Sequence, residues 1–273
     1  MTILLALSGA VFYGLSDFVG GIASRRTSAW SVALVAALSG GVFLLAGGLV
    51  RGGDPTGEDL AWGVLAGVGN GFGTAFLYRG LAGGRMGVVA PISAVGAALV
   101  PVAVGLLAGE RPTALVWLGI LAAVPGIWLV SQDPAAGPRG GVLDGVLAGL
   151  GFGVLFAALG QVPEEAGLLP LALNQLVGAA VIVAVALSLR KPWLPREGPA
   201  AFGVVCGALG ASATVAFLLA TQTGALTIAA VLASLYPAVT ILLAAVVLKE
   251  HVHRGQGFGL GLCGLAVALV AVG

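Results

Sequence analysis

Apolar segments of about twenty residues repeat along the chain, separated by short polar breaks or breaks rich in glycine and proline. A helix that crosses a bilayer needs about 20 mostly apolar residues, because its backbone must satisfy its own hydrogen bonds in lipid. These segments do not alternate between apolar and polar residues as the strands of a membrane barrel do. The pattern predicts ten membrane-spanning helices, at 3–24, 29–50, 59–80, 86–108, 113–131, 141–162, 168–188, 199–221, 226–248 and 255–272.

The composition points to an integral membrane protein. Of the 273 residues, 59% are apolar and only 8% are charged, and the mean hydropathy is +1.10. A soluble domain carries roughly 25% charged residues, so this chain has too few charged residues to cover a folded surface in water. The net charge of +1 gives no reason to expect a nucleic acid partner. Cys206 and Cys263 lie in apolar runs and imply neither a disulfide nor a metal framework.

The two halves of the chain resemble each other at a constant offset. Residues 61–67 fall on 201–207, and Glu110 falls on Glu250, at the same shift of 140 residues and without a gap. Single identities mean little in a sequence of this composition, but one offset across several separated helices indicates an internal repeat. We therefore expect a five-helix repeat over 1–133, a linker over 134–140 and a second five-helix repeat over 141–273.

An odd number of helices in each repeat implies that the two copies insert in opposite orientations. In the predicted topology ten of the twelve Lys and Arg residues lie on one side, and Arg51 and Arg111 lie on the other. Positive loops stay in the cytoplasm, so we predict an inverted repeat in the inner (plasma) membrane with both termini outside. Such repeats place a substrate site near the bilayer midplane and support alternating access.

Glycine recurs every fourth residue in three of the predicted helices. Small residues at this spacing form a face that lets helix backbones approach closely in lipid. We interpret these stripes as packing surfaces. They comprise Gly63, Gly67 and Gly71, then Gly141, Gly145, Gly149 and Gly153, and finally Gly257 and Gly261.

Asp17 lies inside the first apolar run, which begins at Ile3 and ends at Arg25. It is eight residues from Arg25, about 12 Å along a helix, which is too deep for a short side chain to reach water. An ionised carboxylate at such a depth costs about 2.5–3.5 kcal/mol. Asp17 must therefore find a partner on another helix, bind a cation or an amine, or take up a proton. Two interpretations remain open: a group on a transport path that binds a substrate amine or a coupling proton, and a structural hydrogen bond to a neighbouring helix.

Other polar residues share the depth or the helix face of Asp17. Tyr13 and Ser16 lie with it on one arc of about 100°, and Asn70, Thr74 and Tyr78 follow one another at a spacing of four. Amides and phenols in lipid need a partner, whereas a lone Ser or Thr usually bonds its own backbone. The candidate cavity residues are Asp17, Tyr13, Ser16, Asn70, Thr74, Tyr78, Ser93, Asn174, Gln175, Thr214, Ser234 and Tyr236.

Prolines interrupt two of the predicted helices. Pro91, Pro101 and Pro237 each remove a backbone hydrogen bond and predict a kink. We interpret these kinks as bends that shape the bundle.

The remaining charged residues suggest no catalysis. Glu110 and Glu250 occupy equivalent helix ends and are interpreted as charges at the membrane boundary. Arg79 is the one cationic candidate near a cavity and lies close to a helix end, so phosphorylated substrates are not expected. No cluster of His, Cys or Asp has metal spacing, and no nucleophile and base are paired. We expect no enzyme activity, no metal and no cofactor.

Two motifs resemble a known family. Tyr13-Gly-Leu-Ser-Asp-Phe-Val-Gly-Gly is similar to the opening of EamA-like proteins in the drug/metabolite transporter superfamily. Leu107-Ala-Gly-Glu-Arg-Pro-Thr, followed by Leu118-Gly-Ile-Leu-Ala-Ala-Val-Pro-Gly, resembles the end of that family's repeat. Leu248-Lys-Glu-His-Val is the second copy, with Lys249 in place of Gly and His251 in place of Arg.

This resemblance implies a ten-helix carrier of small metabolites, with a central cavity lined by the first four helices of each repeat. We therefore predict a secondary transporter, working as an exporter, of amino acids or related zwitterions by alternating access. Its expected partners are the metabolite, the lipid bilayer and, where transport is coupled, protons, and it is expected to be a monomer or a homodimer. The alternatives are a passive facilitator with a structural Asp17, and a non-catalytic structural membrane protein.

Overall fold

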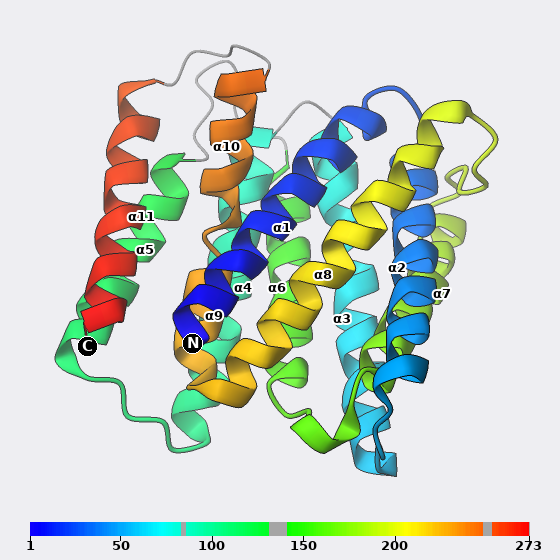
Figure 1. Ribbon diagram of the computed structural model, residues 1–273. Helices are drawn as coiled ribbons and strands as arrows, with labels where there is room; N and C mark the ends of the chain where they lie inside the picture. Colours follow the sequence, from blue (N-terminus) through cyan, green and yellow to red (C-terminus); the bar gives the residue numbers. More distant parts are fainter. Residues whose placement is uncertain (83–85, 131–140, 248–252, 273) are drawn as a thin grey trace.

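The computed structural model of the protein describes residues 1–82, 86–130, 141–247 and 253–272, and in these residues it contains helices and no strands (Figure 1). The first half contributes α1 (Thr2–Ser24), α2 (Ala29–Arg51), α3 (Gly57–Ala82), α4 (Met86–Leu107) and α5 (Ala114–Val130). The second half contributes α6 (Val142–Leu159), α7 (Leu169–Ser188), α8 (Phe202–Thr223), α9 (Leu226–Ala233), α10 (Tyr236–Val247) and α11 (Arg254–Val272). Two 3-10 turns, η1 (Glu164–Ala166) and η2 (Gly198–Ala201), precede α7 and α8.

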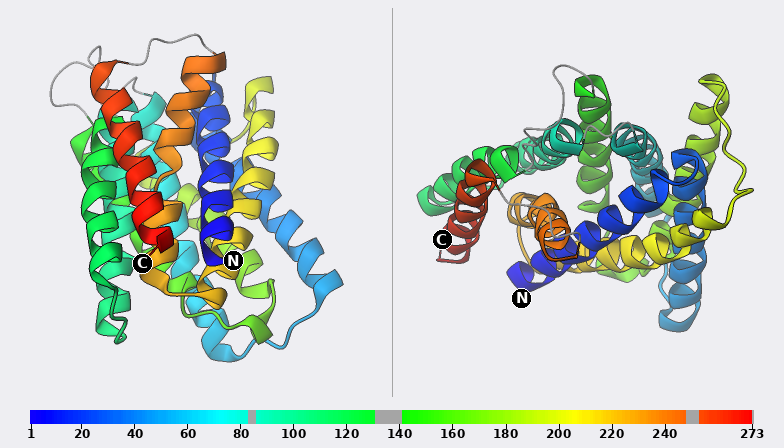
Figure 2. Two further views of the ribbon diagram at one scale, coloured as in Figure 1. Left: turned by 60° about the vertical axis from the view of Figure 1, so that its left-hand side comes forward. Right: turned by 90° about the horizontal axis from the view of Figure 1, so that it is seen from above.

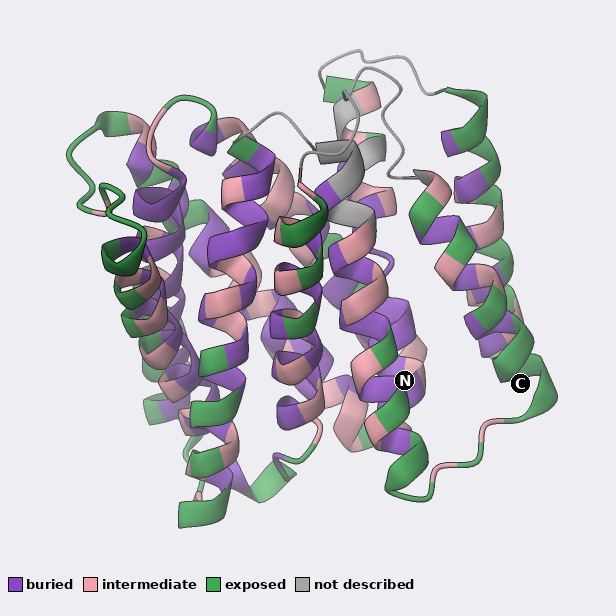
Figure 3. Cartoon of the chain, turned by 180° about the vertical axis from the view of Figure 1, so that it is seen from behind, coloured by how far each residue is buried: buried purple, intermediate pink, exposed green. Residues whose placement is uncertain are grey.

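The length of the helices and their surface fit a multi-pass membrane protein. Among the described residues, seven segments are long and apolar enough to cross a bilayer, with α9 and α10 counted as one segment, and parts of α4, α5 and α11 form three shorter apolar helices. Large apolar side chains cover the outside of the bundle; Val42, for example, is 68% exposed and Phe258 is 66% exposed. Exposed residues occur along most of the helices (Figure 3). Water would penalise such a surface, whereas lipid tails do not.

The predicted helix 226–248 is interrupted in the structure. α9 ends at Ala233 and α10 begins at Tyr236, and the chain turns at Ser234 and Leu235 between them. Pro237 has no N–H group with which to continue the ladder, and the N–H of Ala238 bonds instead to the carbonyl of Leu235 (2.9 Å). Pro237 therefore does more than bend the helix, whereas α4 runs past Pro91 and Pro101 without a break.

The two halves of the chain pack into each other. α1 contacts α8 and α6 contacts α3, and these pairs become equivalent when the halves are exchanged. In the same way, the contact of α2 with α8 corresponds to that of α7 with α3. The contact of α1 with α9 and α10 corresponds to that of α6 with α4. α5 and α11 pack on each other at one edge of the bundle (Figure 2). Most contacts between helices therefore join one half to the other.

α1 and α6 run in opposite directions through the bundle (Figure 1). The hydroxyl of Thr2, at the start of α1, lies 3.1 Å from that of Thr223, at the end of α8. At the same end of the bundle, Gln222 Nε2 donates to the carbonyl of Val162, just beyond the end of α6 (3.4 Å). We call this end of the bundle the Thr2 end. α1 thus begins where α6 finishes.

Glycine allows these close approaches on two of the three predicted faces. A Cβ at Gly67 would lie 2.6 Å from the carbonyl oxygen of Asn174, and a Cβ at Gly149 would lie 3.1 Å from the Cα of Gly96. Helix backbones therefore touch at both positions. The interpretation is wrong for α11, because a Cβ at Gly257 or Gly261 would meet nothing within 4 Å among the described residues.

The contrast between buried and open glycines gives a first prediction. A Cβ at Gly151 would lie 2.5 Å from the backbone nitrogen of Gly73 and 2.7 Å from the carbonyl oxygen of Gly69. Gly151→Ala should therefore push α6 from α3 and destabilise the protein by about 1–3 kcal/mol. Gly261→Ala, also within a helix, should be neutral or gain up to about 1 kcal/mol of helix propensity. Unfolding of both purified variants in detergent measures the difference, and equal stabilities would contradict the packing.

Candidate solute-binding site

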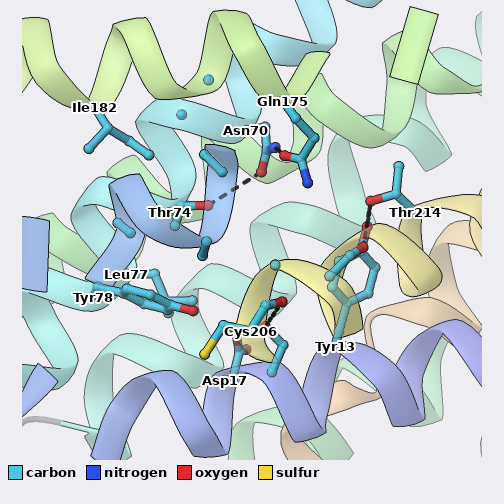
Figure 4. Close-up of a pocket in the computed structure, with 18 of the residues that line it drawn as sticks. Tyr13, Asp17, Asn70, Thr74, Leu77, Tyr78, Gln175, Ile182, Cys206 and Thr214 are labelled. Carbon is cyan, nitrogen blue, oxygen red and sulfur yellow. Dashed lines mark hydrogen bonds between the residues drawn. The ribbon is translucent and has the colours of Figure 1, made fainter. Parts of the chain in front are cut away.

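A pocket lies between the two halves, walled by α1, α2 and α3 from the first half and by α6, α7 and α8 from the second (Figure 4). The empty space inside it is about 570 Å³, its open side included. Two thirds of the residues predicted for a cavity line it. They are Tyr13, Ser16, Asp17, Asn70, Thr74, Tyr78, Gln175 and Thr214.

Asp17 is the charged group of this pocket. Its side chain is partly exposed to the cavity, and among the described residues no hydrogen bond or ion pair reaches its carboxylate. Tyr13, Tyr78 and Tyr236, which are all the tyrosines of the chain, lie within electrostatic range of it, as does Cys206. The neighbours of Asp17 are therefore uncharged polar groups rather than a counter-ion.

Three of the hydroxyl groups near Asp17 donate their protons to the protein. Ser16 Oγ donates to the carbonyl of Cys206 (3.1 Å), and Thr214 Oγ1 donates to that of Gly210 (2.8 Å). The hydroxyl of Tyr13 lies 3.1 Å from Thr214 Oγ1. Because the single proton of Thr214 is already used, Tyr13 is the donor of this bond. These three hydroxyls leave oxygen lone pairs for any further partner.

An amide pair forms the opposite wall of the pocket (Figure 4). Asn70 Nδ2 on α3 donates to Gln175 Oε1 on α7 (2.6 Å), and Thr74 Oγ1 donates to Asn70 Oδ1 (3.3 Å). Gln175 Nε2 packs against α2, since a Cβ at Gly40 would lie 2.5 Å from it. This wall is polar and uncharged.

An aromatic layer lies on the side of the pocket nearer the Thr2 end. The ring of Tyr13 meets Phe156 edge-on at 5.7 Å and Tyr236 at 6.4 Å, and Phe156 lies 4.5 Å from Phe217. Phe156 and Phe217 are buried. Tyr13 precedes Asp17 by one helical turn, so these rings lie on the side of Asp17 nearer the Thr2 end.

The other four predicted residues are buried outside the lining of the pocket. Ser93 and Tyr236 face each other, with their hydroxyls 3.0 Å apart. Asn174 is completely buried, and neither atom of its amide has a hydrogen-bond partner among the described residues. Ser234 is buried at the break between α9 and α10, and its hydroxyl likewise has no partner in the described part of the chain.

Sequence reasoning missed the apolar part of the wall. α2 contributes Ala33, Ala36 and Ala37, and small residues of this kind carry no polar signal that distinguishes a cavity from a packing face. Cys206 also lines the pocket, although its apolar surroundings in the sequence suggested only packing. Gly71 lines the pocket as well, and its position next to Asn70 in the sequence could have predicted this.

Arg79 lies outside the pocket. Its Nε donates to Asp144 Oδ1 on α6 (2.7 Å), its Nη2 contacts the same oxygen, and its guanidinium stacks on Phe76 at 4.4 Å. The cation is thus neutralised by a partner from the other half. It adds no positive charge to the lining of the pocket.

Glu110 has a more specific role than a boundary charge. Its Oε1 accepts from the N–H of Leu226 (2.7 Å) and its Oε2 from the N–H of Thr227 (3.0 Å), which caps the start of α9. A carboxylate is favourable at this position because it meets free N–H groups and the positive end of the helix dipole. The contact ties the end of the first half to the second half. Its repeat counterpart, Glu250, lies outside the described residues.

Comparisons with known proteins agree with this architecture. The model of the EamA-like transporter family matches residues 1–132 and 139–272. A solved structure, titled only "Crystal structure of protein", has 19% sequence identity, covers 99% of this chain and 96% of its own, and superposes with a TM-score of 0.74. At that identity the likeness concerns the fold alone. A comparison with curated protein sequences gave no match.

The chain therefore belongs to the EamA-like transporter family, and the resemblance of its motifs is confirmed. It is a helical membrane protein of a family of transporters.

The amide wall gives a second prediction. Asn70→Ala and Gln175→Ala should each destabilise the protein by about 1–3 kcal/mol, because each leaves a polar partner unsatisfied in the bundle. The double variant should cost less than the sum, with a coupling of about 0.5–3 kcal/mol. Unfolding of the four proteins in detergent measures this coupling, and strictly additive effects would show that the two amides do not depend on each other.

Proposed function

We propose that the chain is a secondary carrier that moves a small metabolite across the membrane by alternating access around the pocket between its halves. The observation that carries this proposal is the unpaired carboxylate of Asp17, exposed to a cavity that takes three helices from each half. A charge without a partner costs free energy in lipid. A solute or a proton that supplies the missing partner would offset that cost.

We propose ten membrane spans in an inverted repeat, with α9 and α10 as the two parts of one interrupted span. The opposite directions of α1 and α6 support this topology, as does the exchange symmetry of the helix contacts. The positive-inside rule then puts the Thr2 end outside the cell. Both termini are extracytoplasmic in this arrangement, and the membrane is the inner (plasma) membrane.

We propose that the aromatic layer closes the pocket on the side of the Thr2 end, as in one state of an alternating-access cycle. The aromatic layer and the bond between Thr2 and Thr223 lie between the pocket and the outside in the proposed topology. The cap of Glu110 on α9 joins the two halves as well. In the other state these contacts between halves would open while contacts at the cytoplasmic end close.

Asp17 is the proposed recognition group. It would bind the ammonium group of the solute, or exchange a proton during the cycle, and the hydroxyl lone pairs around it would accept further N–H groups. Amino acids and related zwitterions contain such an ammonium group, and the family resemblance suggests export as the direction. The pocket requires no cofactor for this task.

A passive facilitator is the second candidate function. The absence of any partner for Asp17 among the described residues favours the carrier, because a structural aspartate would bond to a neighbouring helix.

Replacement of Asp17 separates the two functions. Asp17→Asn keeps the shape of the side chain but removes its charge, and it should fold normally yet reduce solute uptake at least about tenfold, since a hydrogen bond to a charged group is worth about 1.5–3 kcal/mol. Any dependence of uptake on pH should be lost if Asp17 exchanges the proton. Proteoliposomes loaded with a panel of radiolabelled amino acids and amines provide the assay.

Asp54→Asn is the matched control, because Asp54 lies exposed in the loop between α2 and α3, outside the pocket, and its replacement should leave uptake within about twofold of the wild type. Normal uptake and an unchanged pH profile in Asp17→Asn would reject the recognition role. Reduced stability of Asp17→Leu alone would then identify Asp17 as structural.

A further inference from the structure

The pocket carries only one kind of charge, which limits the solutes that it can accept. Among the described residues that line it, Asp17 is the only one with a formal charge. The nearest cation that could have balanced a second group, Arg79, is occupied by Asp144 and Phe76 and does not line the pocket. A solute therefore meets one negative charge and no positive charge.

The hydrogen-bond donors of the pocket are largely used within the protein. Tyr13, Ser16 and Thr214 direct their hydroxyl protons to protein oxygens. On the opposite wall, Thr74 donates to Asn70, which gives one of its two N–H groups to Gln175. Apart from the hydroxyl of Tyr78, which also lines the pocket, the side around Asp17 thus presents oxygen acceptors, which suit a ligand that brings N–H donors.

The opposite wall offers weak compensation for a negative group. The free donors there are the second N–H of Asn70 and the amide of Gln175, and the nitrogen of Gln175 packs against Gly40. These groups are neutral dipoles. A solute carboxylate placed among them would be buried without a counter-ion, which is unfavourable in a medium of low dielectric constant.

We propose that the pocket selects amines with a single positive charge and no carboxylate. An ammonium group at Asp17 makes the complex of solute and pocket neutral, and its N–H groups meet the acceptors of Ser16 and Tyr13. An uncharged polar or apolar remainder lies toward Asn70 and Gln175. A zwitterion leaves the complex with a net negative charge. This inference rests on the proposed function and narrows its solute class from amino acids to their decarboxylated counterparts.

Pairs of compounds that differ only in a carboxylate test the proposal. The pairs are 2-aminoethanol and serine, 3-methylbutylamine and leucine, and 2-phenylethylamine and phenylalanine. Thermal unfolding of the purified full chain in detergent is followed against the concentration of each compound at pH 7, because a ligand of the folded state raises its stability in proportion to its affinity. Wild type, Asp17→Asn and the control Asp54→Asn are compared.

The proposal expects at least one amine to stabilise the wild type and Asp54→Asn, with an apparent Kd at least about tenfold lower than that of its amino acid. The same amine should give no shift in Asp17→Asn, which also controls for effects of amines on the detergent.

Three results would overturn it: equal or tighter binding of the amino acids, a shift by the amines that persists in Asp17→Asn, or no shift by any amine up to tens of millimolar. Uptake of an amino acid that depends on Asp17 would refute this solute class and leave the carrier function standing. Failure of every tested solute to be transported would count against the carrier itself.

Discussion

Close contact between helices of opposite halves is the interaction on which the pocket depends. In lipid no hydrophobic force drives helices together, so their association relies on packing at short range. Glycine makes this range accessible: Gly67 on α3 lies against α7, and Gly149 on α6 lies against α4. The contact at Gly67 holds α3 and α7 close enough for Asn70 to bond Gln175, and so it fixes the wall that faces Asp17. The site is therefore a product of the interface between the repeats.

The lipid environment that makes packing decisive also raises the free-energy cost of an unpaired charge at Asp17. The protein neutralises Arg79 with Asp144 and gives Glu110 the N–H groups of α9, yet among the described residues it provides Asp17 with no such partner. A carboxylate left in this state inside a cavity stores free energy that a positive ligand or a proton can release. In the proposed function, stability and recognition are thus in tension at Asp17, as is common at functional sites.

The local features of this architecture could be predicted from the sequence, and the long-range ones could not. Helical spans follow from the length of apolar runs, because a spanning backbone must satisfy itself within each segment. The sequence also predicts that the side chains of Asn70 and Asp17 face a cavity or another helix, because an amide or a carboxylate in lipid needs a partner. The alanine wall of α2, the pairing of Arg79 with Asp144 and the open face at Gly261 depend on which helices become neighbours, and no local pattern contains that information.

The central claim is that one pocket serves both sides of the membrane in turn, and accessibility under a cross-link tests it most directly. A cysteine at Thr74 would report on the pocket in a chain whose native cysteines are replaced by alanine, and a disulfide between cysteines at Thr2 and Thr223, whose hydroxyls lie 3.1 Å apart, would lock the Thr2 end. Labelling with a membrane-impermeant thiol reagent is measured in sealed vesicles of both orientations. The account predicts labelling from both sides before the lock, and from the cytoplasmic side alone after it. Labelling from the outside that survives the lock, or labelling from neither side before it, would contradict the account.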